Sequence, residues 1–376
     1  MGELLKRLAI LGSTGSIGCQ VLDIVRSFKD HFTVTGLAAG DNITEFLTQV
    51  EEFRPRFVTC KDNGALQCKA GFLSMEDMAA HPDVDMVIVA TTGKAGLQPT
   101  LAALKAGKLT AIANKEILVM AGDIISGMAT RYGASILPID SEHSAVWQCL
   151  RGEDGVVKRL LLTASGGPFF GQPMDMLAGV TVEQALAHPT WKMGKKVTID
   201  SATLFNKGME AIEARWLFDI PYEKIEILVH RQSIIHSMVE FADGSIKAQL
   251  STPDMRLPIQ YALFYPERME NNSLSCIDFN NIHTLTFEPV NYSQFPCLKL
   301  ALEAARRGGS YPAALCAADE IAVQLFLDGK IKFTEIAGII ETTLNLHKPH
   351  SRAGLEEILL TDSWARETAF KIARKG

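Results

Sequence analysis

Short apolar runs alternate with amphipathic segments over the first 140 residues of the chain. Residues 7–11, 33–39 and 85–91 read as strands, and the last of these, DMVIVAT, is the most apolar. Segments with helical spacing separate them, such as residues 16–28 and 97–105. This alternation predicts an α/β fold with a parallel sheet that helices cover on both faces. Ligands of such sheets bind at the carboxyl ends of the strands.

The pattern changes near residue 150. Strand-like apolar runs follow at residues 157–163, 224–229, 237–241 and 246–250. Asp243-Gly244 predicts a hairpin between the last two of these runs. Beyond an aperiodic stretch, the chain ends in helical patterns. We therefore predict four segments: a parallel-sheet domain at 1–149, a central α+β catalytic or connective domain at 150–265, a linker at 266–296 and a C-terminal α-helical bundle at 297–376.

Composition narrows the class of protein. The chain has 376 residues, 47% of them hydrophobic and 21% charged, which predicts a packed protein of two or three domains. A net charge of −6 argues against nucleic acid as the main partner. The seven cysteines include no C-x-x-C, which predicts reduced thiols in a cytoplasmic protein. We expect no membrane span and no signal peptide, because no apolar run reaches about 18 residues and the first strand begins at once.

A glycine-rich turn, GSTGSIG at residues 12–18, lies between the first predicted strand and helix. Its G-x-x-G-x-x-G spacing differs from the G-x-G-x-x-G of the standard dinucleotide fingerprint. A strand, a tight turn and a helix N-terminus nevertheless suit a pyrophosphate. We therefore favour nucleotide binding over a purely structural turn.

The second predicted strand ends at Gly40-Asp41-Asn42, where the ribose of a dinucleotide should lie. Asp41 is able to bind a ribose 2′-OH, which favours NAD, and it would repel the 2′-phosphate of NADP. Nearby lysines or backbone donors would offset that repulsion. The sequence leaves the choice between NAD and NADP open.

Charged residues follow two later strands. A lysine next to a glutamate, Lys115-Glu116, is either a solvated ion pair or the place of a cation that orients substrate. On extended chain, Asp140 and Glu142 point the same way and suit a hard divalent cation such as Mg²⁺ or Mn²⁺. A D-x-E pattern is also a frequent accident, but Glu210 as a third oxygen ligand improves the case. We expect His143 in the first turn of a helix rather than as a ligand.

The stretch from His188 to Glu210 is the most informative part of the sequence. Its first half is basic and amphipathic, which suits a mobile flap over an anionic ligand, with Trp191 as the apolar cover and Gly194 as the pivot. Ser201 is predicted to cap a helix or to contact an anion at its N-terminus. The side chains that follow it on one helical face are Asn206, Lys207 and Glu210. The alternative is a capped surface helix with a Lys–Glu pair.

Long motifs in this chain resemble those of the 1-deoxy-D-xylulose 5-phosphate reductoisomerases. They are GSTGSIG (12–18), ANKE (113–116), DSEHSA (140–145), ASGGPF (164–169), HPTWKMG (188–194), SATLFNKGMEAIEARWLF (201–218), VHRQSIIHSMVEF (229–241) and STPDMR (251–256). With the C-terminal helices, the resemblance covers nearly the whole chain.

The resemblance implies a homodimeric oxidoreductase that depends on NADPH and on Mg²⁺, Mn²⁺ or Co²⁺, with a Rossmann-like N-terminal domain. It implies conversion of 1-deoxy-D-xylulose 5-phosphate to 2-C-methyl-D-erythritol 4-phosphate, by retro-aldol cleavage, re-addition and hydride transfer, in the non-mevalonate route to isoprenoids. Two other classes remain: a metal-assisted NAD(P)-dependent sugar-phosphate dehydrogenase without rearrangement, and a non-catalytic dinucleotide-sensing protein.

The resemblance also implies site residues. Those for the cofactor are Thr14, Gly15, Ser16, Ile17, Gly40, Asp41, Asn42, Asn114, Glu116 and Gly194. Those for the metal are Asp140, Glu142 and Glu210. Substrate would contact Lys115, Ser141, Glu142 and Glu210, and its phosphate would contact Ser165, His188, Ser201, Asn206 and Lys207. Those with catalytic roles are Lys115, Glu142, His188 and Trp191, the last closing a flap at about 186–198. Asp41 departs from the family, which often has a basic residue there.

Overall fold

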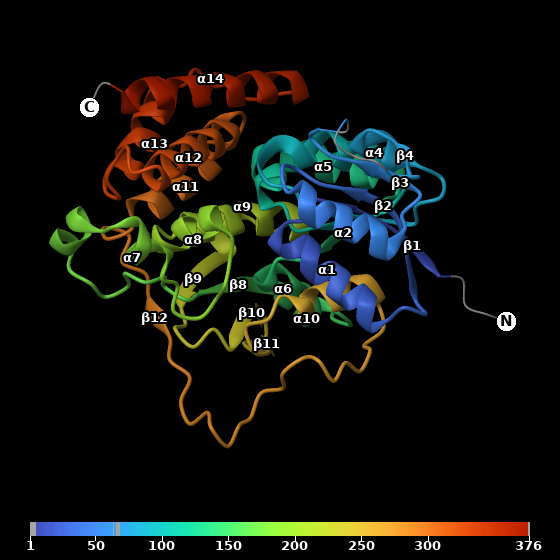
Figure 1. Ribbon diagram of the computed structural model, residues 1–376. Coiled ribbons are helices and arrows are strands. Elements are labelled where there is room, and N and C mark those ends of the chain that lie inside the picture. Colours follow the sequence, from blue (N-terminus) through green and yellow to red (C-terminus); the bar gives the residue numbers. More distant parts are fainter. Residues whose placement is uncertain (1–4, 63, 65–67, 375–376) are drawn as a thin grey trace. The chain divides into compact units, whose positions relative to one another are not determined.

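The computed structural model describes residues 5–62, 64 and 68–374 of the chain (Figure 1). It forms two compact units, and each unit combines separate stretches of sequence. The first unit comprises Met1–Ile117, Asp123–Ser144 and Asp254–Ser275, and the second comprises Leu118–Gly122, Ala145–Pro253 and Cys276–Gly376. The predicted segments at 1–149, 150–265, 266–296 and 297–376 instead follow the order of the chain, and they stay a prediction.

A parallel sheet forms the centre of the first unit, as the alternating pattern predicted. Its seven described strands lie in the order β4-β3-β2-β1-β5-β6-β7. They are β1 (Lys6–Leu11), β2 (Phe32–Ala38), β3 (Phe57–Thr59), β4 (Gly71–Phe72), β5 (Met86–Val89), β6 (Leu109–Ile112) and β7 (Ile136–Pro138). Strand β5, in the interior of this sheet, is buried along its whole length, as a strand covered on both faces must be.

Helices of the first unit connect these strands. They are α1 (Ser16–Ser27), α2 (Ile43–Phe53), α3 (Met75–Ala80), α4 (Leu97–Lys105), α5 (Lys115–Tyr132) and the start of α6 (Ser141–Leu150). Helix α10 (Arg256–Phe264) joins them from far along the chain. The ring of Phe264 packs edge-on against Phe28 and Phe32, at 4.8 Å between centroids in both cases. This contact explains why Asp254–Ser275 belongs to the first unit.

The second unit contains a mixed sheet in the order β11-β10-β8-β9-β12. Its strands are β8 (Val157–Ala164), β9 (Ile225–Val229), β10 (Ile235–Phe241), β11 (Ile246–Leu250) and β12 (Glu288–Pro289). Strands β8 and β9 run parallel, and β10 pairs antiparallel with both β8 and β11. The predicted hairpin between β10 and β11 is therefore confirmed.

Helices of the second unit form one hydrophobic core with the C-terminal bundle. They are α7 (Val182–Leu186), α8 (Lys195–Ala202), α9 (Phe205–Phe218), α11 (Pro296–Arg307), α12 (Tyr311–Leu327), α13 (Glu335–Leu346) and α14 (Leu355–Ala373), the last four orange to red in Figure 1. Ile199 of α8 and Phe205 of α9 share this core with Leu315 of α12. Gly208 lets α9 approach α11 closely, because a Cβ there would lie 2.4 Å from the Cβ of Ala301.

The glycine-rich turn after β1 is fixed by packing against its neighbours. Gly12 has φ +92°, and a Cβ there would lie 2.4 Å from the carbonyl oxygen of Ala90. A Cβ on Gly18 would lie 2.2 Å from the carbonyl oxygen of Gly12. The backbone N–H groups of Gly12 and Ser13 both donate to Ala38 O, at 2.8 and 2.9 Å. The turn is therefore fastened to the ends of β2 and β5, and Gly15 closes it by donating its backbone N–H to Gly12 O at 3.1 Å.

Replacing Gly18 by alanine should lower the free energy of unfolding by about 1–3 kcal/mol, because the backbone of Gly12 would have to move. Gly127→Ala is the matched control, since this exposed glycine of α5 has no atom within 4 Å of a built Cβ. It should instead raise stability by about 0.5–1 kcal/mol. Urea unfolding followed by circular dichroism measures both, and equal shifts in the two variants would contradict the packing argument.

Candidate active site

The outer residues of the glycine-rich turn are the ones predicted to hold the cofactor. Gly15 and Ser16 are exposed and Thr14 and Ile17 are half-buried, whereas Gly18 is buried. Helix α1 begins at Ser16, and Gly15 in the N-cap position has no side chain to occupy the free N–H groups of the first turn. Those groups therefore remain available to an anion.

The end of β2 combines an open backbone with charge. A Cβ on Gly40 would meet no atom within 4 Å. Asn42 caps α2, its Oδ1 accepting from the backbone N–H of Glu45 at 3.4 Å. Between them, Asp41 forms an ion pair with Lys61, with 2.9 Å between Oδ1 and Nζ. Lys61 was not singled out from the sequence, although it follows β3 as Asp41 follows β2.

Asn114 joins the ends of β5 and β6. Its Oδ1 accepts from the backbone N–H of Ile117 at 3.3 Å and so caps α5, which begins at Lys115. Its Nδ2 donates to Gly93 O at 2.9 Å and to Thr91 Oγ1 at 3.1 Å. Asn114 therefore shapes this strand edge, and the neighbouring Glu116 is also buried.

Lys115 and Asp140 meet because they follow adjacent parallel strands. The backbone N–H of Ile139 donates to Ile112 O at 2.9 Å, so the ends of β6 and β7 lie side by side. The ammonium of Lys115 lies 2.5 Å from Asp140 Oδ2, and both side chains are largely buried. The cation at the end of β6 thus pairs with the carboxylate expected to bind metal.

The acidic residues after β7 differ from the prediction in their backbone. Helix α6 begins at Ser141, so the argument that Asp140 and Glu142 point the same way on extended chain is wrong. Their carboxylate oxygens nevertheless lie within 4.8 Å of each other. Ser141 links them, since its backbone N–H donates to Asp140 Oδ1 at 3.0 Å and its Oγ donates to Glu142 Oε2 at 2.6 Å. Two oxygen donors at this spacing suit a hard divalent cation.

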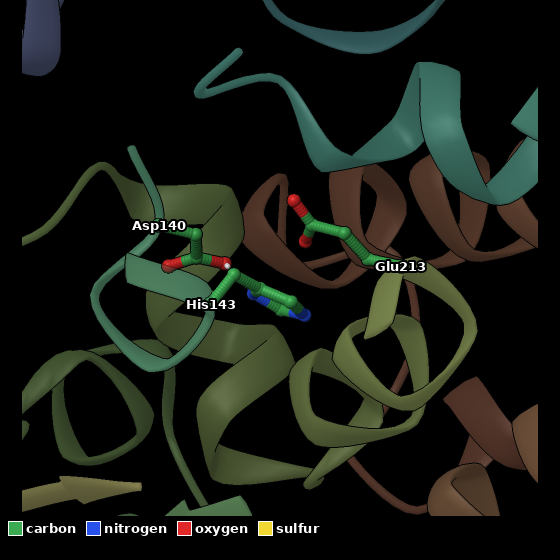
Figure 2. A group of neighbouring side chains, drawn as sticks. All are labelled: Asp140, His143 and Glu213. Atoms are coloured by element: carbon green, nitrogen blue, oxygen red, sulfur yellow. Dashed lines mark ion pairs between the residues drawn. The ribbon is translucent and has the colours of Figure 1, made fainter. Parts of the chain in front are cut away.

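His143 lies in the first turn of α6, as predicted. The ring is fully buried, and Nδ1 is 3.8 Å from Asp140 Oδ2 (Figure 2). A helix that begins at Ser141 turns the side chains of Glu142 and His143 in different directions.

Three predicted phosphate contacts meet in the second unit. His188 Nε2 lies 2.9 Å from Ser165 Oγ and 3.1 Å from Ser201 Oγ. His188 Nδ1 accepts from the backbone N–H groups of Thr190 and Trp191, at 3.2 and 2.9 Å. Because Nδ1 is an acceptor, the neutral ring carries its hydrogen on Nε2. Burial lowers the pKa of His188 to about 4, so the ring is neutral at pH 7.

The turn after β8 lies directly against the end of α8. Gly166 and Gly167 have φ +82° and +64°, and a Cβ on Gly167 would lie 2.7 Å from Ser201 O. The backbone N–H of Gly167 donates to Ser165 Oγ at 3.2 Å. One imidazole N–H and two hydroxyl groups therefore converge at a narrow turn, which is a set of neutral donors for an oxyanion.

Ser201 is not the helix cap that its sequence context predicted. It lies inside α8, and Leu204 with φ +55° separates α8 from α9. The expected common face of α9 is confirmed: Asn206 Nδ2 donates to Glu210 Oε1 at 2.5 Å, and Lys207 forms an ion pair with Glu210. Lys207 and Glu210 are both buried, so the Glu210 carboxylate holds its charge beside an ammonium.

Glu213 is a further buried carboxylate on α9 that the sequence reading did not single out (Figure 2). It follows Glu210 by three residues and so lies one turn further along the same helix. That spacing was the signal available in the sequence.

The predicted flap is a loop followed by a helix. Gly194 is the N-cap of α8, so residues from Lys195 onward are helical. The indole of Trp191 packs edge-on against His236, with 5.8 Å between ring centroids. A Cβ on Gly194 would meet no atom within 4 Å. The loop from α7 to Gly194 thus carries Trp191 and His188 into the site.

A buried ion cluster fastens α8 to α12. Lys196 Nζ lies 2.6 Å from Asp200 Oδ2 and 3.0 Å from Asp319 Oδ2. Both aspartates are fully buried. Burial raises the pKa of Asp319 to about 6, and the charge of Lys196 opposes that rise. The sequence reading found no chemical cluster in the C-terminal helices, yet Asp319 of α12 fixes the helix that carries Ser201.

Three models of protein families match the chain. They are described as 1-deoxy-D-xylulose 5-phosphate reductoisomerase (residues 8–122), its C-terminal domain (136–218) and DXP reductoisomerase C-terminal domain (250–368). Among the described residues, no helix is long and apolar enough to cross a membrane.

Curated relatives match the chain along nearly its whole length. A 1-deoxy-D-xylulose 5-phosphate reductoisomerase of Caldanaerobacter subterraneus subsp. tengcongensis is 50% identical over 383 residues, covering 99% of each chain. That of Geotalea uraniireducens is 51% identical, covering 96% of this chain and 97% of its own.

Solved structures agree in sequence and fold. The reductoisomerase from Zymomonas mobilis in complex with NADPH has a TM-score of 0.90 and 40% identity, covering 98% of this chain and 99% of its own. A DOX-P reductoisomerase in complex with NADPH, fosmidomycin and magnesium has a TM-score of 0.92 and 39% identity, covering 98% of each chain.

Protonation of the Asp319 carboxyl group should make the free energy of unfolding depend on pH. Because its carboxyl group binds a proton more tightly in the folded protein than in the unfolded chain, its contribution to stability falls as pH rises from about 4 to 6. Asp319→Asn removes this dependence, so wild type should lose stability relative to the variant over that range, by about 1.4 kcal/mol per unit of pKa difference. Urea unfolding at several pH values measures it. Asp154→Asn, at an exposed loop position, should leave the pH profile unchanged.

Proposed function

The chain belongs to the 1-deoxy-D-xylulose 5-phosphate reductoisomerase family, and from this premise we propose which of its residues perform each part of the reaction. It converts 1-deoxy-D-xylulose 5-phosphate to 2-C-methyl-D-erythritol 4-phosphate with NADPH and a divalent cation. The observation that carries this conclusion is identity of about half of all residues over the whole length of named reductoisomerases.

NADPH, when bound, supplies the hydride that reduces the rearranged aldehyde. We assign its pyrophosphate to the start of α1, which the packed turn at residues 12–18 leaves open. The proposed contacts are Thr14, Gly15, Ser16, Ile17, Gly40, Asp41, Asn42, Asn114, Glu116 and Gly194. Gly12 and Gly18 support the fit. A Cβ on either residue would collide with backbone atoms, so only glycine allows the turn to pack this closely.

A divalent cation, when bound, supplies a Lewis acid for the two oxygens of the substrate that carry developing negative charge. We propose Asp140, Glu142 and Glu210 as its ligands. The support is chemical: each offers carboxylate oxygens, Asp140 and Glu142 lie close together, and no thiol is needed for Mg²⁺ or Mn²⁺. Lys115 and Ser141, which contact these carboxylates, are then placed to meet the reacting end of the substrate.

The substrate phosphate is assigned to Ser165, His188, Ser201, Asn206 and Lys207. The first three offer neutral donors, and the neutral ring of His188 donates from Nε2 without bringing a second positive charge. Lys207 supplies the full charge and is held in place by Glu210. A phosphate held away from the reacting carbons serves as a handle, whose binding energy positions the other end of the molecule.

We further propose that the carbon skeleton rearranges by retro-aldol cleavage and re-addition. This route passes through an enediolate, and the ammonium of Lys115 is the protein cation placed to stabilise it. Trp191 covers the site and excludes water while the fragments are separate. Glu142 acts at the end of the substrate that meets the metal, and His188 acts at the phosphate end.

The enzyme is also proposed to be a cytoplasmic homodimer. All seven cysteines are free thiols, which is the usual state in a reducing compartment. Sedimentation velocity of the purified chain would test the dimer.

The direct test is oxidation of NADPH in the presence of 1-deoxy-D-xylulose 5-phosphate, with and without Mg²⁺ or Mn²⁺. Metal-dependent oxidation and a branched tetrol phosphate as product are expected. A product with an unbranched skeleton would instead indicate a dehydrogenase without rearrangement, and no oxidation by folded, metal-loaded protein would contradict the assignment.

Glu210→Gln should weaken metal binding. The amide keeps the size of the carboxylate but removes the charge that pairs with the buried Lys207, so circular dichroism must show a folded variant before its metal affinity is compared. Loss even of a residue behind a metal ligand commonly costs about 10–100-fold in affinity, so the Mn²⁺ dissociation constant should rise at least about tenfold, with a parallel loss of turnover. Mn²⁺ binding followed by electron paramagnetic resonance measures it. Glu341→Gln, on an exposed position of α13, should change neither quantity. Unchanged Mn²⁺ affinity in Glu210→Gln would remove it from the ligands.

Ser165→Ala should raise the KM for the phosphorylated substrate by about tenfold, because hydrogen bonds to charged groups contribute about 1.5–3 kcal/mol. The affinity for NADPH should stay unchanged. This variant is sharper than Lys207→Ala, which would also leave the buried carboxylate of Glu210 without its cation. Steady-state kinetics measures the KM, and Ser363→Ala, at an exposed position of α14, is the control. An equal KM in the two variants would place the substrate phosphate elsewhere.

A further inference from the structure

We propose that Lys61 is a specificity-determining residue, which binds the 2′-phosphate of NADPH and offsets the charge of Asp41. This inference rests on the proposed NADPH site and concerns the choice between NADPH and NADH. No motif of the family includes Lys61, and the sequence alone left that choice open because Asp41 argues for NADH.

The two residues meet because their strands are parallel neighbours. Strand β2 pairs with β3 in the register Ala38 with Thr59, and the backbone N–H of Ala39 donates to Thr59 O at 3.0 Å. The segments that follow β2 and β3 therefore leave the sheet at the same end of the strands. Asp41 and Lys61 follow that last hydrogen bond by two residues each, and 2.9 Å separates Oδ1 from Nζ.

The position of this pair is where the adenosine ribose of a dinucleotide lies in folds of this class. The ribose follows the second strand of the sheet, about 20 residues beyond the glycine-rich turn. In this chain the turn donates to Ala38 O, so the turn and the end of β2 are in direct contact. Gly40 adds an open stretch of backbone between them and Asp41. A cation here faces the 2′ position of the ribose.

Exposure makes Lys61 available to a ligand. The side chains of Lys61 and Asp41 are 73% and 79% exposed. An exposed ion pair of this kind contributes at most about 1 kcal/mol, so it is easily exchanged for another partner. A phosphate carries more negative charge than a carboxylate and offers three oxygens, so it competes well for the ammonium.

Two other cations of this region, Arg56 and Lys69, lie at the opposite end of the strands. Arg56 precedes β3 and forms an ion pair with Asp83. Lys69 precedes β4 and so lies at the amino end of the parallel sheet. Lys69 is an exposed lysine of the same region and therefore serves as the matched control.

The test measures dissociation constants of the full-length protein for NADPH and NADH, by titration of nicotinamide fluorescence. Lys61→Ala should weaken NADPH binding by about tenfold, the value of one hydrogen bond to a charged group, and leave NADH binding unchanged. Lys69→Ala should change neither. Added salt should weaken NADPH binding more than NADH binding in wild type, and this difference should shrink in Lys61→Ala.

Exchange of the charges gives a second test. The double variant Asp41→Lys/Lys61→Asp keeps one cation and one anion at the edge, so it should restore the preference for NADPH that Lys61→Ala loses. A purely structural role for the pair would not predict restored discrimination between the two dinucleotides.

Three results would overturn the inference. Equal NADPH affinity in wild type and Lys61→Ala would remove Lys61 from the 2′-phosphate, and equal losses for NADPH and NADH would assign it a structural role. Both results leave the proposed NADPH site standing. Failure of the wild-type protein to bind either dinucleotide would instead overturn the proposed cofactor site, and this inference with it.

Discussion

The position of Ser201, one of the residues proposed to bind the substrate phosphate, depends on a charge cluster buried in the second unit. Lys196 of α8 lies between Asp200 of the same helix and Asp319 of α12. Charges without water are stable only in the company of opposite charges, so α8 cannot leave α12 without exposing an unpaired group. Ser201 is the next residue after Asp200. The C-terminal helices, which contribute no predicted contact to the substrate, therefore determine where a phosphate contact lies.

The helix that follows is positioned by close packing instead of charge. Gly208 has no side chain, and this allows α9 to pack closely against Ala301 of α11. Phe205 of α9 is fully buried in the core that these helices share. Asn206 and Lys207 then converge on Glu210. Two neighbouring helices of the site are thus held by different forces, one of which responds to pH while the other does not.

Much of the fold follows from local pattern, because strand and helix periods are read directly from the order of apolar residues. The bounds of α4 agree with the helical spacing predicted for residues 97–105. The break between α8 and α9 could not be predicted, since Leu204 adopts a left-handed conformation that its residue type disfavours and that only the packed surroundings impose. For the same reason Ser201 was misread as a cap. The two expectations for the sequence D-S-E-H conflicted, since His143 was placed in a first helical turn while Asp140 and Glu142 were treated as extended chain. The start of α6 at Ser141 confirms the first and contradicts the second.

Some residues of the candidate site were predicted from the sequence and others were not. Ser165, His188 and Ser201 were expected from motifs, and their convergence on one imidazole nitrogen needs the turn at Gly166-Gly167. Glu213 was missed although it follows Glu210 by one helical turn, and Asp319 was missed because no spacing in the C-terminal helices reveals its burial. Long-range pairs of this kind depend on the tertiary arrangement of helices, and one sequence holds no record of it.

The residues that follow the carboxyl ends of β2 and β3 show why a single position is a poor guide to the choice between NADPH and NADH. A 2′-phosphate responds to the sum of the charges around it, and the Coulomb energy depends on distance whichever strand supplies the charge. Asp41 alone predicts repulsion, whereas Asp41 with Lys61 at 2.9 Å presents a nearly neutral pair whose ammonium is exposed. Parallel strands bring such residues together because their ends share one edge of the sheet. On the proposal made above, cofactor specificity is carried by the charges at the ends of both strands together and not by Asp41 alone.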